Sequence, residues 1–178
     1  MKTNPHRQRG VTLIEASMVL AVSSVLATTA VPGMQDMIAA RRLDNAANQL
    51  ASDIHLTRSA AVARNQAIRL SFVSRAGGSC YVIHTGAAHE CSCAASGPAQ
   101  CSGGAHEIKT ATVAAADRVV LQANVGSLLF DPLHGTSSPT GTLRLIGTND
   151  RAIHHVVNVM GRVRSCSPQA AVPGYRAC

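Results

Sequence analysis

Aromatic side chains are scarce in this chain of 178 residues, which contains two Tyr, two Phe and no Trp. Proteins that bind single-stranded nucleic acid stack its bases on aromatic rings, so this scarcity argues against such a site. Lysine is nearly absent as well, because the sequence has only Lys2 and Lys109. Arginine therefore supplies most of the positive charge, and its planar guanidinium suits bidentate contacts with phosphate.

The chain also lacks the short motifs that mark common catalytic sites. It contains no G-x-S-x-G elbow, no Walker loop, no H-E-x-x-H helix and no convincing pair of acids. We therefore expect no enzymatic activity, no catalytic residues and no cofactor.

The longest apolar stretch lies near the N-terminus and holds one acid. Three basic residues precede Gly10, and from Val11 follow about 21 mostly apolar residues, enough to cross a bilayer core of ~30 Å. A carboxylate inside such a segment costs roughly 2.5 kcal/mol or more, so Glu15 indicates a function. The basic residues predict a cytoplasmic leader. A plain signal anchor, in which Glu15 is incidental, is the alternative.

The sequence RQRG/VTLIE resembles the class III signal of type IV pilins and type II secretion pseudopilins. In that family a prepilin peptidase cuts after the glycine and methylates the new N-terminus, and the glutamate docks the subunit against a neighbour's terminal amine. The resemblance implies cleavage between Gly10 and Val11 and an assembly role for Glu15. The family usually has phenylalanine where this chain has Val11, and its helices often bend or melt near the position of Pro32.

Helical spacing continues beyond the apolar stretch and predicts one long helix that ends at about Asn65. Its apolar stripe consists of Leu43, Ala47, Leu50, Ile54 and Ala61. The expected domains are a leader peptide at 1–10, a transmembrane and assembly half of the helix at 11–32, an amphipathic half at 33–65 and a head at 66–178, which includes a Cys-rich loop at 86–106 and a C-terminal tail at 160–178.

After Gln66 the apolar period changes to two, which predicts a β-rich head. Ile68, Leu70 and Phe72 start the first strand, and 80–85 is its predicted hairpin partner. Further strands are expected at 118–122, 127–131, 142–146 and 153–159, with the turn sequences DPLHG, SSPTG and GTND between them. The predicted fold class is α+β: a long N-terminal α-helix packed on an antiparallel β-sheet or sandwich head, as in pilins.

All six cysteines follow the apolar stretch: Cys80, Cys91, Cys93, Cys101, Cys166 and Cys178. A cytoplasmic leader would place them in an exported, oxidising compartment, where an even number of cysteines indicates disulfides. Cys166 and Cys178 enclose a short tail and are expected to pair with each other. A bond between Cys91 and Cys93 would be strained, so Cys80 is expected to pair with one of these two and Cys101 with the other.

A zinc site is the alternative reading of the Cys-rich loop, since His89, Cys91, Cys93, Cys101 and His106 carry zinc-binding groups. Their spacing matches no standard zinc finger, so we expect disulfides and no metal. His154 and His155 fall on opposite faces of a predicted strand and cannot chelate a metal together.

A cluster of arginines follows the last predicted strand. Residues two apart in an extended segment point the same way, so Arg162 and Arg164 form a pair, and Gly161 before them permits a tight turn or a close approach. A bond between Cys166 and Cys178 would draw Arg176 toward this pair. From Arg151 to the last residue the chain has four arginines and no Asp or Glu, which makes a positive patch suited to a phosphate backbone.

The GRVR run resembles the GRxR motif of FimT-type minor pilins, which bind DNA at the pilus during natural transformation. The stretch FDPLHGTSSPTGTLRLIG…RAIHHVVNVMGRVRSC is similar to the GspH/FimT branch of the pilin family. DNA-binding roles carry over to Gly161, Arg162 and Arg164, and we add Arg176 by inference.

This resemblance implies a protein that crosses the inner membrane once, has a periplasmic head and enters an extracellular pilus. Its implied partners are other pilins, prepilin peptidase, the inner membrane and double-stranded DNA bound without sequence specificity. Two other functions fit the same signals: a FimU-like minor pilin that primes pilus assembly without binding DNA, and a GspH-type pseudopilin of type II secretion.

Overall fold

The computed structural model describes residues 12–75, 78–94 and 98–178. A single long helix, α1 (Leu13–Arg64), precedes eleven strands and two short 3-10 helices in this part of the chain. The strands are β1 (Ile68–Arg75), β2 (Gly78–His84), β3 (Cys91–Ser92), β4 (Gln100–Cys101), β5 (Glu107–Ala114), β6 (Val120–Ala123), β7 (Ser127–Phe130), β8 (Ser137–Ser138), β9 (Gly141–Ile146), β10 (Ala152–Val157) and β11 (Val163–Cys166); the 3-10 helices are η1 (Ala115–Asp117) and η2 (Pro168–Ala170). The chain divides into two compact units, of which the first ends at Ile38 and the second is Ala39–Cys178.

The described part of the first unit is the apolar half of α1. An 18-residue window of this helix has a mean hydropathy of 1.7, so the helix is long and apolar enough to cross a membrane by length and composition. The hydroxyl groups of Ser17, Ser24, Thr28 and Thr29 donate hydrogen bonds to carbonyl oxygens one turn earlier, which satisfies these polar groups within the helix. The helix also continues through Pro32, so the melting that the resemblance implied is absent. A proline removes one backbone hydrogen bond, and the turns on both sides keep theirs.

The second unit contains the whole main core, since every residue of that core lies at or beyond Leu43. The predicted stripe of α1 is confirmed, because Leu43, Ala47, Leu50, Ile54 and Ala61 are all buried. They pack against the strands through residues such as Ile68, Leu70, Phe130, Leu143, Leu145 and Ile153. The predicted α+β class is therefore confirmed.

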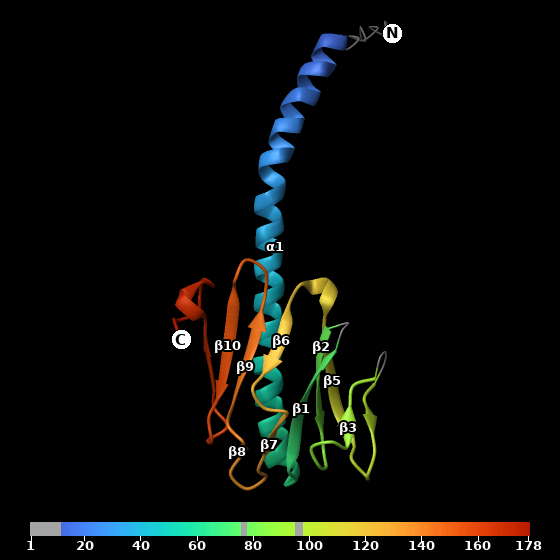
Figure 1. Cartoon of the computed structure of the whole chain (residues 1–178), viewed down its shortest axis with the longest axis vertical. Coiled ribbons are helices and arrows are strands. Elements are labelled where there is room, and N and C mark those ends of the chain that lie inside the picture. The colour runs from blue at the N-terminus through green and yellow to red at the C-terminus, as the bar shows by residue number, and fades with distance from the viewer. Residues whose placement is uncertain (1–11, 76–77, 95–97) are drawn as a thin grey trace, which may run out of the picture. The chain divides into compact units, whose positions relative to one another are not determined.

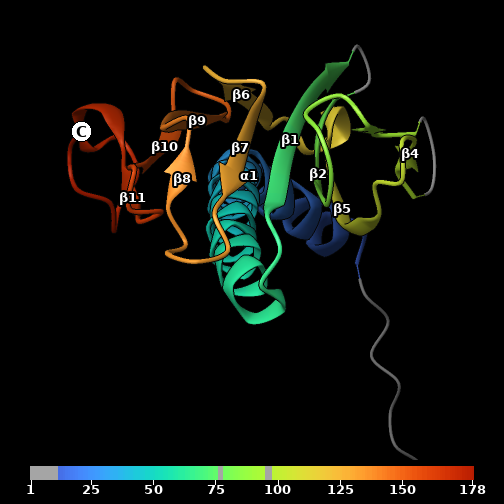
Figure 2. The same cartoon turned by 90° about the horizontal axis from the view of Figure 1, so that it is seen from below.

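Two antiparallel sheets form the head. One has the strand order β5-β2-β1-β7-β8, the other has the order β11-β10-β9-β6, and β3 and β4 form a separate two-stranded ribbon. Seen along the helix, the two sheets lie side by side over the head half of α1 (Figure 2). Both views place the C-terminal tail and the β3–β4 ribbon at opposite ends of this layer (Figures 1 and 2).

Most predicted strands lie where the alternation placed them, but several features differ. The hairpin of β1 and β2 is confirmed, with Phe72 opposite Tyr81. The predicted strand at 118–122 begins later, at Val120, because Arg118 has a φ of 54°. The predicted strand at 153–159 ends at Val157, where a turn begins at Asn158. The alternation did not predict β5, which pairs with β2 along its whole length, or the strands β3, β4, β8 and β11.

Candidate nucleic-acid interface

The strands β10 and β11 form a hairpin. The GRVR run supplies the end of its turn, Gly161 and Arg162, and the first two residues of β11, Val163 and Arg164. The Gly161 N–H donates to the Asn158 carbonyl at 2.9 Å, and the Asn158 side-chain oxygen accepts from the Arg162 N–H at 3.0 Å. Gly161 has a φ of 68°, and a Cβ there would collide with the carbonyl oxygen of Gly135. Glycine is therefore needed for this turn, and the close approach that it permits is to the chain's own backbone.

Arg162 and Arg164 are exposed on the outer face of the β11-β10-β9-β6 sheet. Arg164 lies opposite Val156 of β10, which is itself 39% exposed. Val163, between the two arginines, lies opposite buried Val157 and therefore faces α1. This alternation places both guanidinium groups on the side away from the core, as the spacing predicted.

The C-terminal tail returns to the end of β11 and brings Arg176 with it. A disulfide joins Cys166 to Cys178, as expected. The Ser167 N–H donates to the Arg176 carbonyl at 2.8 Å, and Ser167 and Ala177 form a parallel bridge. Arg176 is exposed. Its backbone lies beside Ser167, which is five residues or about 17 Å along the extended chain from Arg162, so the three arginines are spread along the edge of the sheet and do not form a single fork.

Internal contacts hold this tail independently of the disulfide. Val172 is buried in the main core, and the Tyr175 hydroxyl donates to the Asp44 carboxylate at 2.8 Å. Partial burial, followed by the charge and hydrogen bond of Asp44, raises the pKa of Tyr175 to about 12. The tail is thus folded onto α1 and the sheet edge, and Arg176 has a fixed attachment point.

Arg144 and His154 also lie on the outer face of the β11-β10-β9-β6 sheet, and neither was predicted from the sequence to belong to a DNA-binding site. Arg144 of β9 lies opposite His154 of β10 and is exposed between buried Leu143 and Leu145. The pKa of His154 lies below its ordinary value because partial burial disfavours the charged form and, second, because the Arg144 guanidinium repels it. The T-L-R-L-I alternation could have indicated an outward Arg144, but its place beside β10 required the strand order.

His155, on the inner face of the same strand, holds the sheet against α1. Its Nε2–H donates to the Ala47 carbonyl at 3.0 Å, and its Nδ1 accepts from the Ser165 hydroxyl at 2.8 Å. The expectation that the two adjacent histidines occupy opposite faces of the strand is confirmed, with His155 buried and His154 partly exposed.

The residues of the expected assembly signal lie in or before α1. Gly10 and Val11 are outside the residues that the structure describes. Glu15 lies in the exposed first turn, where its N–H donates to the Thr12 hydroxyl at 3.3 Å. The apolar side chains around it are strongly exposed, including Leu13 at 89% and Ile14 at 66%.

The cysteines of the loop at 86–106 are joined in disulfides. Cys80 pairs with Cys93, and Cys91 pairs with Cys101, which resolves the choice that the sequence left open. These thiolates are therefore not available as metal ligands, and no group of three or more His, Cys, Asp or Glu that could hold a metal occurs among the described residues. The ribbon of β3 and β4 lies at the opposite end of the head from β10 and the C-terminal tail (Figure 1).

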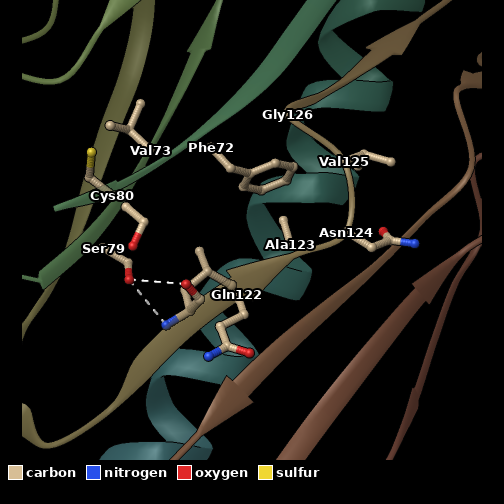
Figure 3. A pocket seen from close by; sticks show the side chains of 11 residues that line it. Phe72, Val73, Ser79, Cys80, Gln122, Ala123, Asn124, Val125 and Gly126 are labelled. Carbon is tan, nitrogen blue, oxygen red and sulfur yellow. Dashed lines mark hydrogen bonds between the residues drawn. The ribbon is translucent and has the colours of Figure 1, made fainter.

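A cleft of about 500 Å³ opens where the two sheets meet, lined by residues of β1, β2 and the β6–β7 segment. In Figure 3 the Ser79 hydroxyl bridges the sheets, since it donates to the Leu121 carbonyl at 3.0 Å and accepts from the Leu121 N–H at 3.3 Å. The lining residues include no acid, no base and no free thiol. The lining therefore has no side chain that could act as a general base to activate the hydroxyls of Ser74 or Ser79.

Comparison with known proteins identifies the class and then the family. The profile described as "Prokaryotic N-terminal methylation motif" matches residues 5–31, which include the start of the long helix α1, and a long helix packed on antiparallel sheets is the arrangement of pilin-like proteins. The profile described as "Type II transport protein GspH" matches residues 46–161, and the chain belongs to this family.

Two crystal structures of the type IV minor pilin FimU from Pseudomonas aeruginosa PAO1 have a similar fold. The first matches with a TM-score of 0.55 and 19% identity over 72% of this chain and 94% of FimU. The second matches with a TM-score of 0.52 and 18% identity over 71% of this chain and 97% of FimU. At these identities the likeness shows the pilin fold alone. No match was found among curated protein sequences.

The chain is thus a pilin-like protein of the minor pilin or pseudopilin kind, which implies association with other pilins in a pilus. Its apolar helix and methylation motif are consistent with a single-pass membrane anchor.

Proposed function

We propose that this chain is a minor type IV pilin that binds double-stranded DNA without sequence specificity and supports DNA uptake in natural transformation. The observation that carries this proposal is the exposure of Arg162, Arg164 and Arg176 on a segment that has no Asp or Glu from Arg151 onward. Gly161 contributes by fixing the turn from which Arg162 projects.

Non-specific DNA binding needs cations that can approach the backbone without competing carboxylates. Arg162, Arg164 and Arg176 form no ion pair with any residue that the structure describes. Each arginine that contacts a phosphate releases counterions, so it adds about 0.9 to the slope of log K against log salt. Binding in the range of about 1–100 µM at physiological salt is typical of such a surface.

The test compares two double variants of the full chain in zwitterionic detergent. Arg162→Gln with Arg164→Gln should lower the salt slope for a duplex of arbitrary sequence by roughly two units. Arg41→Gln with Arg75→Gln removes the same charge from exposed positions elsewhere and should leave the slope unchanged. Equal binding by the first variant and the wild type would exclude the GRVR run as the site.

We also propose that the chain is processed and assembled like other pilins. Prepilin peptidase would cleave between Gly10 and Val11, the head would lie in the periplasm, and Glu15 would pair with the terminal amine of a neighbouring pilin. A carboxylate among exposed apolar residues supports such a pairing, because burial of the charge without a partner is costly. Mass spectrometry should find methylated Val11 as the mature N-terminus. Glu15→Ala should be processed and folded normally but depleted from sheared pili.

A second candidate is a minor pilin or pseudopilin that functions in assembly alone, without binding DNA. It is favoured by the packing of the tail, since Gly161, Val172 and Tyr175 all make internal contacts that a purely structural segment would also make. A wild-type chain that does not bind duplex DNA even at low salt, yet enters pili, would support this candidate.

A further inference from the structure

The outer face of the β11-β10-β9-β6 sheet, together with the C-terminal tail beside it, carries cations on three chain segments. The register aligns Gln122, Arg144, His154 and Cys166 in one row across the four strands. In the adjacent row Thr142, Val156 and Arg164 lie opposite one another. Arg144 and Arg164 are therefore two strands and two residues apart, and their Cα atoms lie about 12 Å from each other.

Arg176 lies in the first of these rows. Its neighbour Ala177 pairs with Ser167, and Cys178 points outward to meet Cys166. Residues two apart in an extended segment share a face, so Arg176 is on the same side as Cys178. The Cys178 Sγ lies 3.8 Å from the His154 Nδ1, which places the tail directly beside the centre of the row.

None of the outward positions on these strands is acidic. They are Val120 and Gln122 on β6, Thr142, Arg144 and Ile146 on β9, Ala152, His154 and Val156 on β10, and Arg164 and Cys166 on β11. Like charges on one face repel, and among the residues described no carboxylate pairs with Arg144 or Arg164. A bound polyanion would remove this repulsion and gain contacts with several strands at once.

We infer that this outer face is the DNA-contacting surface, that Arg144 is one of its phosphate-binding residues, and that the duplex lies across β9, β10 and β11 instead of along the C-terminal tail. The inference rests on the proposed DNA binding and adds to it a residue outside the GRVR run. A duplex is a rod with one charge per about 1.7 Å of its axis, so a surface spread over several strands contacts more phosphates than one turn can.

The test uses Arg144→Gln in the full chain, with Arg75→Gln as the matched control. Both are exposed arginines of β-strands, and each substitution removes one charge. Arg144→Gln should lower the salt slope by about 0.9, so that the loss of affinity for a fluorescent duplex between 50 and 200 mM salt becomes about three- to fourfold smaller. Arg144→Lys should retain most of this slope, because the charge remains. The control should behave like the wild type.

The possible outcomes separate this inference from the proposed function. If Arg162→Gln with Arg164→Gln reduces binding and Arg144→Gln does not, the inference fails and the proposed function stands. If the wild type does not bind DNA, or binds only vesicles of anionic lipid, both are overturned. Melting of each variant by circular dichroism is the fold control, and the Lys variant keeps the test valid if Gln lowers stability.

Discussion

The Lys109 ammonium lies 2.6 Å from the Asp53 carboxylate and joins β5 to α1 inside the head. Asp53 is 2% exposed and also accepts hydrogen bonds from the Tyr81 hydroxyl at 2.7 Å and the Gln49 amide at 3.0 Å. Burial, and then the bond to Asp53, raise the pKa of the Tyr81 hydroxyl, which therefore remains a donor throughout the working pH range. The carboxylate is thus fully satisfied by three elements.

Lys109→Met should destabilise the second unit by about 1 to 3 kcal/mol. The Asp53 charge would stay buried without its cation, although two hydrogen bonds would remain. Asp53→Asn with Lys109→Met should cost less than the sum of the two single changes, because the double variant leaves no unpaired charge. Urea unfolding of Ala39–Cys178 measures these free energies. Additive costs would mean that the ion pair contributes nothing.

Stability should fall when the pH drops below about 6.5, in part because of His155. Burial holds the pKa of His155 below its ordinary value, and the neighbouring His154 lowers it slightly further, despite the bond to Ala47. The unfolded chain therefore binds a proton first as the pH falls, and stability present at neutral pH is lost between the unfolded and the folded pKa. Each such histidine contributes up to about 1.4 kcal/mol per pH unit in that window.

His155→Gln should reduce this pH dependence, at a cost in stability at pH 7.5. It should not remove it, because burial also lowers the pKa of His84, whose Nε2 accepts from the Ser71 hydroxyl. Unfolding of Ala39–Cys178 at pH 7.5, 6.5 and 5.5 provides the comparison. A wild-type stability that does not change over this range would contradict the assignment of neutral, buried histidines.

The Cys166–Cys178 disulfide should stabilise the protein mainly by lowering the entropy of the unfolded chain, and it should contribute less to holding the tail in place. Replacing Cys166 and Cys178 together by Ser should cost roughly 2 to 3 kcal/mol and make the chain around Arg176 more sensitive to trypsin. Complete release is not expected, since Val172 and the Tyr175–Asp44 bond still hold the tail. The double change of Cys91 and Cys101 to Ser, at the other end of the head, is the control and should leave cleavage at Arg176 unchanged.

Local patterns predicted the helix, the first hairpin and the disulfide between Cys166 and Cys178, because each depends on residues that are near one another in the sequence. The stripe of α1 follows the helical period, and Cys166 and Cys178 are separated by only 12 positions. The strand β5 escaped prediction for the opposite reason. Its Lys109 faces Asp53 in the interior, and what makes it a strand is pairing with β2, a long-range contact that alternation does not encode.

The surface that carries Arg144, Arg162 and Arg164 was predictable from the sequence only in part. Arg162 and Arg164 are two apart in one segment, so their shared direction follows from the period of a strand. Arg144 lies 18 positions or more before them, and only the order β11-β10-β9 brings it onto the same surface. Similarly, the glycine at 161 predicted a tight turn, but the Gly135 carbonyl oxygen, with which a Cβ at position 161 would collide, belongs to a loop that is distant in the sequence.

His154 should make DNA binding depend on pH. It faces Arg144 from β9 and the Cys166–Cys178 disulfide from β11 and the tail, with Ala152 and Val156 beside it on its own strand and Arg164 and Arg176 nearby. Because its pKa is lowered in the free protein, His154 is neutral at pH 7.5 and becomes cationic only when the pH falls below that lowered pKa. A phosphate on this face would favour the charged form, so protonation and binding should strengthen each other.

The wild type should therefore bind a duplex more tightly at pH 5.5 than at pH 7.5, with a salt slope larger by up to about 0.9, one additional phosphate contact. His154→Gln should bind like the wild type at pH 7.5 and lose this gain at pH 5.5. His89→Gln, on the exposed loop at the other end of the head, is the matched control and should keep the gain. Fluorescence anisotropy at both pH values measures the difference, and melting at pH 5.5 verifies that each variant is folded. An equal gain in His154→Gln and the wild type would mean that the phosphate backbone does not pass over β10.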